Sequence, residues 1–175
     1  FDVAIRGFKK AILLVPDYAE AYNNMGLALK EQGKSKEALK VLNKAISLKP
    51  NFVEAYNNMG NVLVDQNNLE KAIELFQKAI LLYPEYAEAY NNMGLALHYQ
   101  DKSEEAIQVY KKAISLDPDY ADAHRNLGYV LLRNGRLIES FDEIEWRWKT
   151  GKFLGQKRKF LQPLWDGKPS LNGKR

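Results

Sequence analysis

The sequence has no cysteine and only two histidines, His98 and His124, among its 175 residues. Without cysteine the chain can form no disulfide bond and no thiolate metal site, and this composition fits a reducing compartment, so we expect a cytoplasmic protein. The two histidines do not have the spacing of a metal-binding pair, and a nucleophile elbow and a phosphate-binding loop are also missing. We therefore expect no enzyme active site, no metal and no cofactor.

Long apolar runs are missing as well. No segment approaches the roughly 20 apolar residues that a membrane-spanning helix requires, and we find no secretory leader, so we expect no membrane partner. The net charge of +4 is concentrated at one end, because residues 149–175 contain eight basic side chains and one acidic one, a local charge of +7. The other 148 residues contain 18 basic and 21 acidic groups, a charge of −3. This mildly acidic body argues against a nucleic-acid partner.

What the sequence does contain is an internal repeat of 34 residues. The phrase AEAYNNMGLALKEQG begins at Ala19, VEAYNNMGNVLVDQN at Val53 and AEAYNNMGLALHYQD at Ala87. Five columns of residues keep this spacing into a fourth copy: Tyr22, Tyr56, Tyr90 and His124; Met25, Met59, Met93 and Leu127; Gly26, Gly60, Gly94 and Gly128; Ala38, Ala72, Ala106 and Ser140; and Pro16, Pro50, Pro84 and Pro118. A period of about 20–50 residues is typical of a solenoid of stacked units.

Each unit is predicted to contain two helices separated by a tight turn. In the first copy, one apolar stripe covers residues 21–29 and a second covers residues 38–46, both at helical spacing. Between the stripes, each copy has a residue that tolerates a left-handed backbone: Gly33, Asn67, Asp101 and Gly135. The second stripe ends before each proline. Small residues such as Gly26 and Ala38 leave room for close helix packing, and His124, in the tyrosine column, is predicted to be a packed core ring.

This pattern resembles the tetratricopeptide repeat. In the first full copy, the family's small and large positions are occupied by Tyr22, Met25, Gly26, Leu29, Ala38, Leu42, Ala45 and Pro50. The resemblance covers roughly residues 1–149 and implies an all-α, right-handed solenoid of antiparallel helix pairs with about nine helices. We predict the second helix of a truncated repeat at 1–16, four repeat units within 17–149, and a basic, aromatic tail at 150–175. The four units are predicted at 19–52, 53–86, 87–120 and 121–149, and the last of them is atypical.

Both ends of the predicted solenoid look incomplete. Phe1 is not an initiator methionine and residues 1–16 match a second helix, so we expect the natural chain to continue upstream. Four apolar residues of this helix then lack the partner helix that a full repeat would supply: Phe1, Ile5, Phe8 and Ile12. We expect self-association through such exposed end helices. In the tail, aromatic residues stand among lysines, and one interpretation is that the tail folds back over the final helix.

A second interpretation of the tail rests on resemblance. The segments EWRW and QPLWDGKPSLNGKR look like the junction in bacterial tetratricopeptide proteins that continue into a glycosyltransferase-like domain. The resemblance implies that a nucleotide-sugar-binding domain follows Arg175 and that the catalytic part lies outside this chain.

Each predicted first helix contains two adjacent asparagines in its middle. The first column holds Asn23, Asn57 and Asn91, with Arg125 in the fourth copy, and the second column holds Asn24, Asn58, Asn92 and Asn126. An asparagine in a helix interior is roughly 0.5–0.7 kcal/mol less favourable than an alanine, so seven of them cost about 4 kcal/mol. Because whole domains retain only about 5–15 kcal/mol, another interaction should offset this cost.

Two interpretations of these columns are open. In one, the asparagines are polar residues on a solvated helix face that hydrogen-bond to neighbouring groups, and duplication of an ancestral unit copied them. In the other, they line the concave groove and pair with the main chain of an extended peptide, since an amide offers both donor and acceptor. The second column resembles the asparagine ladder in the repeat arm of O-linked N-acetylglucosamine transferase, which holds polypeptides in this way.

The second interpretation defines the candidate peptide-binding residues: Asn23, Asn24, Asn57, Asn58, Asn61, Asn91, Asn92, His98, Arg125 and Asn126. Other candidates for the groove surface are Glu20, Leu27, Glu54, Glu88, Leu95, Tyr99, Tyr129 and Arg133. Our leading hypothesis is a protein–protein interaction scaffold that binds an extended polypeptide in its groove. The alternatives are the non-catalytic, substrate-recruiting arm of a glycosyltransferase, and a purely architectural protein that assembles through its end helices.

Overall fold

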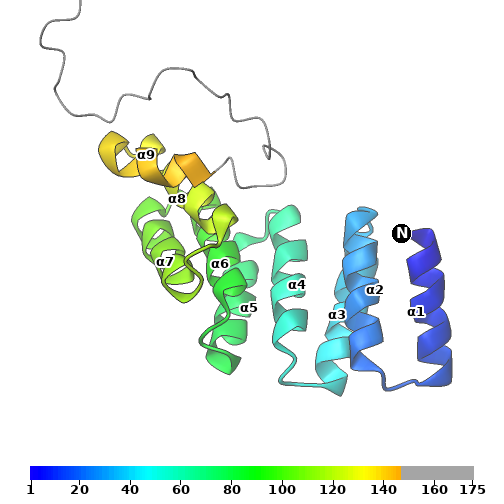
Figure 1. Cartoon of the computed structure of the whole chain (residues 1–175). Coiled ribbons are helices and arrows are strands. Elements are labelled where there is room, and N and C mark those ends of the chain that lie inside the picture. Colours follow the sequence, from blue (N-terminus) through cyan, green and yellow to red (C-terminus); the bar gives the residue numbers. More distant parts are fainter. Residues whose placement is uncertain (147–175) are drawn as a thin grey trace, which may run out of the picture.

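The structure is a computed structural model and describes residues 1–146. Within these residues the backbone forms nine α-helices joined by short turns (Figure 1): α1 (Asp2–Leu14), α2 (Ala19–Glu31), α3 (Ser35–Leu48), α4 (Val53–Asp65), α5 (Leu69–Leu82), α6 (Ala87–Tyr99), α7 (Ser103–Leu116), α8 (Ala121–Arg133) and α9 (Leu137–Glu145). The predicted all-α solenoid is confirmed. The predicted tail at 150–175 and its glycosyltransferase-like junction lie outside the described residues.

The helices form a curved row in which each helix packs against the next (Figure 1). The even-numbered helices α2, α4, α6 and α8 also contact one another, whereas the odd-numbered helices of the described chain make no such contacts among themselves. The even-numbered helices are therefore the inner layer of the solenoid, and the odd-numbered helices lie outside them. Stacking of such helix pairs makes the inner layer the concave face.

A glycine in each inner helix allows the following outer helix to approach closely. Each of these glycines faces a large side chain: Leu42 at Gly26, Phe76 at Gly60, Tyr110 at Gly94 and Ile144 at Gly128. A Cβ atom at Gly60 would lie only 2.5 Å from Cε1 of Phe76. The glycine column and the large side chains thus form one packing contact, repeated once per unit.

Tyr110 is the polar member of the large side chains. Its side chain is fully buried, and its hydroxyl has no hydrogen-bond partner within the described part of the chain. Burial raises the pKa of this phenol above its ordinary value.

We expect Tyr110→Phe to raise the free energy of unfolding by about 1 kcal/mol, because the substitution removes a buried hydroxyl that lacks a partner. Phe76 shows that a phenyl ring fits the equivalent position one repeat earlier. Urea denaturation followed by circular dichroism would measure the change. The reverse substitution, Phe76→Tyr, is the matched control and should be destabilising; a less stable Tyr110→Phe variant would contradict the expectation.

The turns inside the helix pairs use left-handed residues, as the sequence predicted. The φ angles are 72° at Gly33, 57° at Asn67, 59° at Asp101 and 74° at Gly135. After each of these residues, an amide N–H donates to a carbonyl five residues back, as from Lys34 to Leu29 at 2.9 Å. This bond satisfies a carbonyl at the helix end that would otherwise have no partner.

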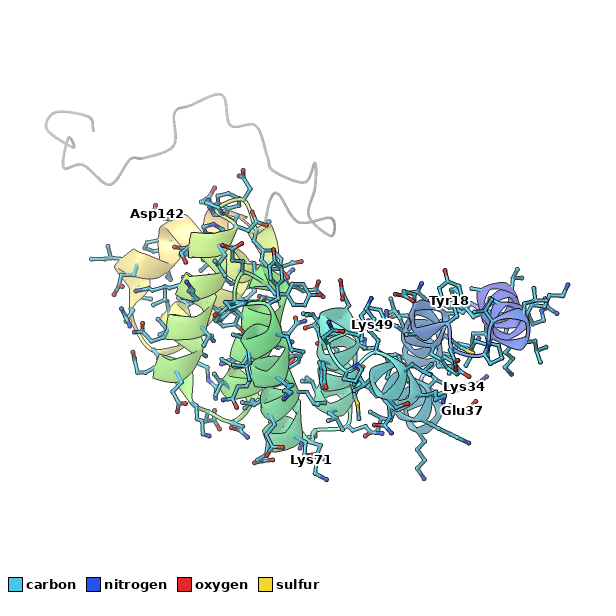
Figure 2. All side chains as sticks on the ribbon, turned by 90° about the horizontal axis from the view of Figure 1, so that it is seen from below. Tyr18, Lys34, Glu37, Lys49, Lys71 and Asp142 are labelled. Carbon is cyan, nitrogen blue, oxygen red and sulfur yellow. The ribbon has the colours of Figure 1, made fainter. Side chains whose placement is uncertain are left out.

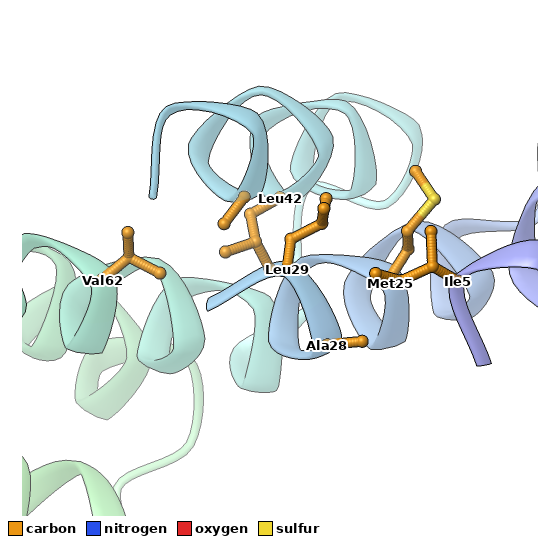
Figure 3. Packing of buried hydrophobic residues seen from close by; sticks show 7 residues of the cluster. Ile5, Met25, Ala28, Leu29, Leu42 and Val62 are labelled. Atoms are coloured by element: carbon orange, nitrogen blue, oxygen red, sulfur yellow. The ribbon is translucent and has the colours of Figure 1, made fainter. Parts of the chain in front are cut away.

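The packing of α1 differs from the prediction. Ile5 is buried beside Met25 of α2 (Figure 3), and Phe8 and Ile12 pack against the same cluster. These three residues lie on one face of α1 at helical spacing, and α2 covers that face. Of the four residues predicted to form an exposed apolar edge, only Phe1 is exposed, because α2 of the next repeat covers the other three. The exposed large apolar side chains here are the N-cap residue Phe1 and, within α1, Val3, Leu13 and Leu14.

Polar side chains cover much of the outside of the row (Figure 2). The labelled residues in that view are all exposed: Tyr18, Lys34, Glu37, Lys49, Lys71 and Asp142. Within residues 1–146, none of the helices combines the length and the apolar composition required to cross a bilayer.

Candidate functional site

The two asparagine columns have different environments on the inner helices. The first column is buried, with Asn57 at 0% exposure and Asn23 and Asn91 nearly as enclosed. The second column is more open: Asn24 is exposed, whereas Asn58, Asn92 and Asn126 are half-buried. Neighbouring residues of an α-helix point about 100° apart around its axis, so two adjacent columns cannot share one direction.

The asparagines form a hydrogen-bonded ladder between neighbouring repeats. In each rung, Nδ2 of a second-column residue donates to Oδ1 of the first-column residue in the preceding repeat. The three rungs are Asn58 to Asn23 at 2.9 Å, Asn92 to Asn57 at 3.0 Å and Asn126 to Asn91 at 3.0 Å. Each rung therefore joins two successive inner helices at a fixed register.

The buried amide of Asn57 also contacts residues outside the ladder. Its Nδ2 donates to Oε1 of Glu88 at 2.9 Å and lies 3.5 Å from the hydroxyl of Tyr86. The Tyr86 hydroxyl donates to Oε2 of the same carboxylate at 3.1 Å. Burial, and secondarily the charge of Glu88, raise the pKa of Tyr86, which keeps its hydroxyl a donor. Sequence reasoning did not associate Tyr86 with the asparagines, because it lies 29 residues after Asn57, at the start of α6.

The geometry gives the first column a role inside the stack, and direct contact of these residues with a peptide stays a prediction. The side chains of Asn23, Asn57 and Asn91 are buried, and their carbonyl oxygens accept bonds from the next repeat. A hydrogen bond contributes about 0.5–1.5 kcal/mol to stability, which is comparable to the combined helix-propensity cost of the two asparagines that form one rung. The interaction that the sequence required therefore lies inside the stack.

The second column retains hydrogen-bonding capacity toward the groove. An amide has two N–H donors and an oxygen with two lone pairs. Asn92 uses one N–H for its rung and accepts from Asn91 at 3.2 Å, and Asn126 uses one N–H and accepts from Arg125 at 3.4 Å. Each of these amides thus keeps one N–H and one lone pair for a further partner.

The other three predicted site residues are on inner helices but do not form one cluster. Asn61 is half-buried on α4, and His98 is half-buried on α6. Burial lowers the pKa of His98, and the positive charge of Arg133 adds to this effect, so the neutral imidazole is favoured. Arg125 on α8 pairs with Asp122 at 3.0 Å, one turn earlier on the same helix.

A hollow of about 460 Å³ lies between α6 and α8 on the inner layer. Its walls come from both helices: Asn91, Leu95, Tyr99, Asp122, Arg125, Asn126 and Tyr129. The sequence named several of these residues as groove candidates, but only the stacking of α6 on α8 brings them together. We refer to this set as the α6/α8 hollow.

The predicted core ring of His124 is confirmed, and its partners were not predicted. The imidazole is buried and stacks on Trp146 with ring centroids 4.0 Å apart. Nε2 lies 3.0 Å from the carbonyl oxygen of Pro118, and Nδ1 contacts a carboxylate oxygen of Glu143 on α9. In this column Tyr56 makes the same contact, donating to the carbonyl of Pro50 at 3.1 Å. His124 therefore preserves the contact of the repeat and adds a link from α8 to α9.

Over the stretch the structure describes, no group of three or more histidine, aspartate, glutamate or cysteine side chains is arranged to hold a metal ion.

Antiparallel helix pairs stacked at a 34-residue period, with an inner concave layer, define a helical-repeat solenoid. The family model of the TPR repeat matches residues 1–33, 26–66, 60–101 and 96–135. The chain belongs to the tetratricopeptide repeat family.

Several solved structures share this fold. The crystal structure of MamA is 28% identical, covers 85% of this chain and 87% of its own, and has a TM-score of 0.72. YrrB, described as a TPR protein with an unusual peptide-binding site, is 24% identical, with coverage of 83% and 75% and a TM-score of 0.67. The first TPR of Spaghetti (RPAP3), bound to the HSP90 peptide SRMEEVD, is 23% identical, with coverage of 67% and 93% and a TM-score of 0.64. No curated protein matches the sequence.

Proposed function

We propose that the chain is a protein–protein interaction scaffold that binds an extended polypeptide along the concave face of its inner helices. The main support for this proposal is the second asparagine column, in which half-buried amides keep unused hydrogen-bonding groups beside the groove. Membership of the repeat family supports this role, as do the peptide ligands named for YrrB and Spaghetti.

The spacing of the column suits a peptide main chain. Packed helices lie about 8–10 Å apart, and an extended peptide advances about 3.3 Å per residue. One amide per repeat then meets a main-chain group at about every third residue of the peptide. Because an amide pairs with the main chain regardless of the side chain, these contacts give affinity without selecting the peptide sequence.

A test should block the groove without breaking the ladder. Asn61 is suitable, since it lies on inner helix α4 at the position that Leu95 occupies one repeat later in the wall of the α6/α8 hollow. Peptides selected from a phage-displayed random dodecapeptide library would be measured by fluorescence anisotropy. Asn61→Trp should weaken their binding by about tenfold or more, which corresponds to about 1.4 kcal/mol.

The matched control is Lys71→Trp, which places the same ring on outer helix α5, where Lys71 extends away from the helices (Figure 2). This variant should bind the selected peptides like the parent chain. Recovery of no binding peptide, or equal loss in both variants, would refute binding along the groove.

We also infer that the chain associates with itself through its end helices, as a contact between α1 of one copy and α9 of another. Exposed apolar residues occur on both helices, including Leu13 and Leu14 on α1 and Ile138 and Phe141 on α9. Their charges are complementary, because α1 has three basic residues and one acidic residue, whereas α9 has four acidic residues and no basic one. A contact between two different surfaces produces rings or open chains of molecules rather than two-fold symmetric dimers.

Sedimentation velocity at increasing protein concentration would test this association. The sedimentation coefficient should rise with concentration and fall with added salt, and Leu13→Glu with Leu14→Glu should abolish the rise. A coefficient that stays constant over the whole concentration range would rule the contact out.

The glycosyltransferase arm and the cytoplasmic location remain predictions. The first depends on residues 147–175, which lie outside the described part of the chain, and the sequence downstream of Arg175 would test it.

A further inference from the structure

We propose that the α6/α8 hollow selects one large apolar side chain, preferably aromatic, of the polypeptide bound in the groove. This inference rests on the proposed function and adds sequence preference to contacts that otherwise involve only the main chain. Asn126 lines the hollow, and Asn92 follows the lining residue Asn91 on α6, so a peptide held by these amides would pass over the hollow.

The apolar walls of the hollow favour a ring. Tyr99 is 56% exposed and Tyr129 is 45% exposed; they stand on two different helices, and Leu95 is the third apolar side chain of the lining. Aromatic rings pair favourably in offset-stacked or edge-to-face arrangements with centroids about 4.5–7 Å apart. A phenyl or indole group in the hollow would cover surface of both tyrosines that water now contacts.

The charges of the hollow are already neutralised within the chain. Arg125 pairs with Asp122 at 3.0 Å, and Arg133, further along α8, pairs with Asp101 at 2.8 Å. An acidic side chain or a phosphate would therefore have to compete with an existing carboxylate for each guanidinium. Because a guanidinium has five N–H donors, Arg125 can still donate to a peptide carbonyl while it remains paired with Asp122.

The equivalent position between α2 and α4 has different chemistry. Two repeats before Leu95, Tyr99 and Tyr129, the corresponding residues are Leu27, Glu31 and Asn61. Lys30 bridges Glu31 and Asp65 at 3.5 and 3.3 Å on the same surface. The start of the groove is thus charged and polar, whereas its end offers two tyrosines and a leucine. This gradient fixes where along the peptide an aromatic residue belongs.

The experiment uses the dodecapeptides recovered from the phage library. Their alignment should show an aromatic or large aliphatic residue at one fixed position, and replacing that residue with alanine should weaken binding to the parent chain by about tenfold or more. In the variant with Tyr99→Ala and Tyr129→Ala, the same replacement should have almost no effect, because the two changes remove the same contact. Both tyrosines are about half exposed, so the variant should fold like the parent chain.

Tyr18→Ala, which removes an exposed tyrosine at the other end of the molecule, is the matched control and should leave the preference intact. Selected peptides without an aromatic or large aliphatic position, or with an acidic residue there, would overturn the hollow's selectivity while leaving groove binding in place. The proposed selectivity would also be overturned if the double tyrosine variant kept the same preference for an aromatic or large aliphatic residue. If no peptide is recovered at all, the proposed function itself fails and this inference with it.

Discussion

Replacing Gly60 with alanine should lower the free energy of unfolding by about 2–3 kcal/mol, near the upper end of the cost of overpacking a well-filled core. The added Cβ atom would lie 2.5 Å from Cε1, 2.8 Å from Cζ and 2.9 Å from Cδ1 of Phe76. Phe76 is fully buried, so its ring has no space into which it can turn. The helices α4 and α5 would have to separate, and every later repeat would shift with them.

Gly7→Ala is the matched control for Gly60→Ala. Gly7 lies in the interior of α1, and a Cβ atom built on it meets nothing within 4 Å. Because alanine is about 1 kcal/mol more favourable than glycine inside a helix, Gly7→Ala should be neutral or stabilising. The same chemical change is therefore expected to have opposite signs at two helical positions. Urea denaturation followed by circular dichroism measures both, and a Gly60→Ala variant as stable as the parent would disprove the packing argument.

The sequence was sufficient to predict the helices, their turns and their stacking. Each of these depends on contacts within one 34-residue unit or on the type of a single residue. Asn67 and Asp101, for example, replace glycine at left-handed turn positions and still adopt φ angles near 60°, as their short polar side chains allow. The column of large side chains opposite the glycines follows the same repeat and was partly predicted through Leu42.

The direction of the asparagine side chains was predicted less well, although the sequence shows that the two columns are adjacent. Asn57 and Asn58 are adjacent, so only one of them can face the groove, yet both were assigned to it. Which of the two faces the groove depends on how far each inner helix is rotated about its own axis relative to the next inner helix. This rotation is set by packing between units. The same limit applies to Glu143, whose contact with His124 joins two helices of the atypical last repeat.

The ladder also changes what an asparagine substitution should report. Helix propensity alone predicts that an alanine at any of these positions stabilises the protein by roughly 0.5–0.7 kcal/mol. The hydrogen bonds predict the opposite at the buried positions and a graded series across the two columns. Substitutions in the ladder therefore test stability first, and they affect a ligand only through the groups that face the groove.

Asn57→Ala is expected to lower the free energy of unfolding by about 2–3 kcal/mol, because it empties a fully buried site and breaks every hydrogen bond that this amide makes. Nδ2 of Asn92 would lose its acceptor at 3.0 Å, and Glu88 would lose its donor at 2.9 Å. Asn58→Ala should cost only about 1 kcal/mol, since its half-buried site admits water as a substitute. Asn24→Ala should be neutral or slightly stabilising, because Asn24 is exposed and only accepts a long bond from Asn23.

Urea denaturation of the three variants would give this order directly, and a double-mutant cycle would isolate the central rung. Combining Asn57→Ala with Asn92→Ala should cost less than the sum of the single changes by about 1 kcal/mol, the coupling of the hydrogen bond between them. Three stabilised variants would mean that helix propensity dominates and that the ladder contributes nothing to folding. If the free energy of unfolding instead falls in the order Asn24→Ala, Asn58→Ala, Asn57→Ala, the buried column is the one that stabilises the fold. The amides facing the groove would then be the ones left free for a ligand.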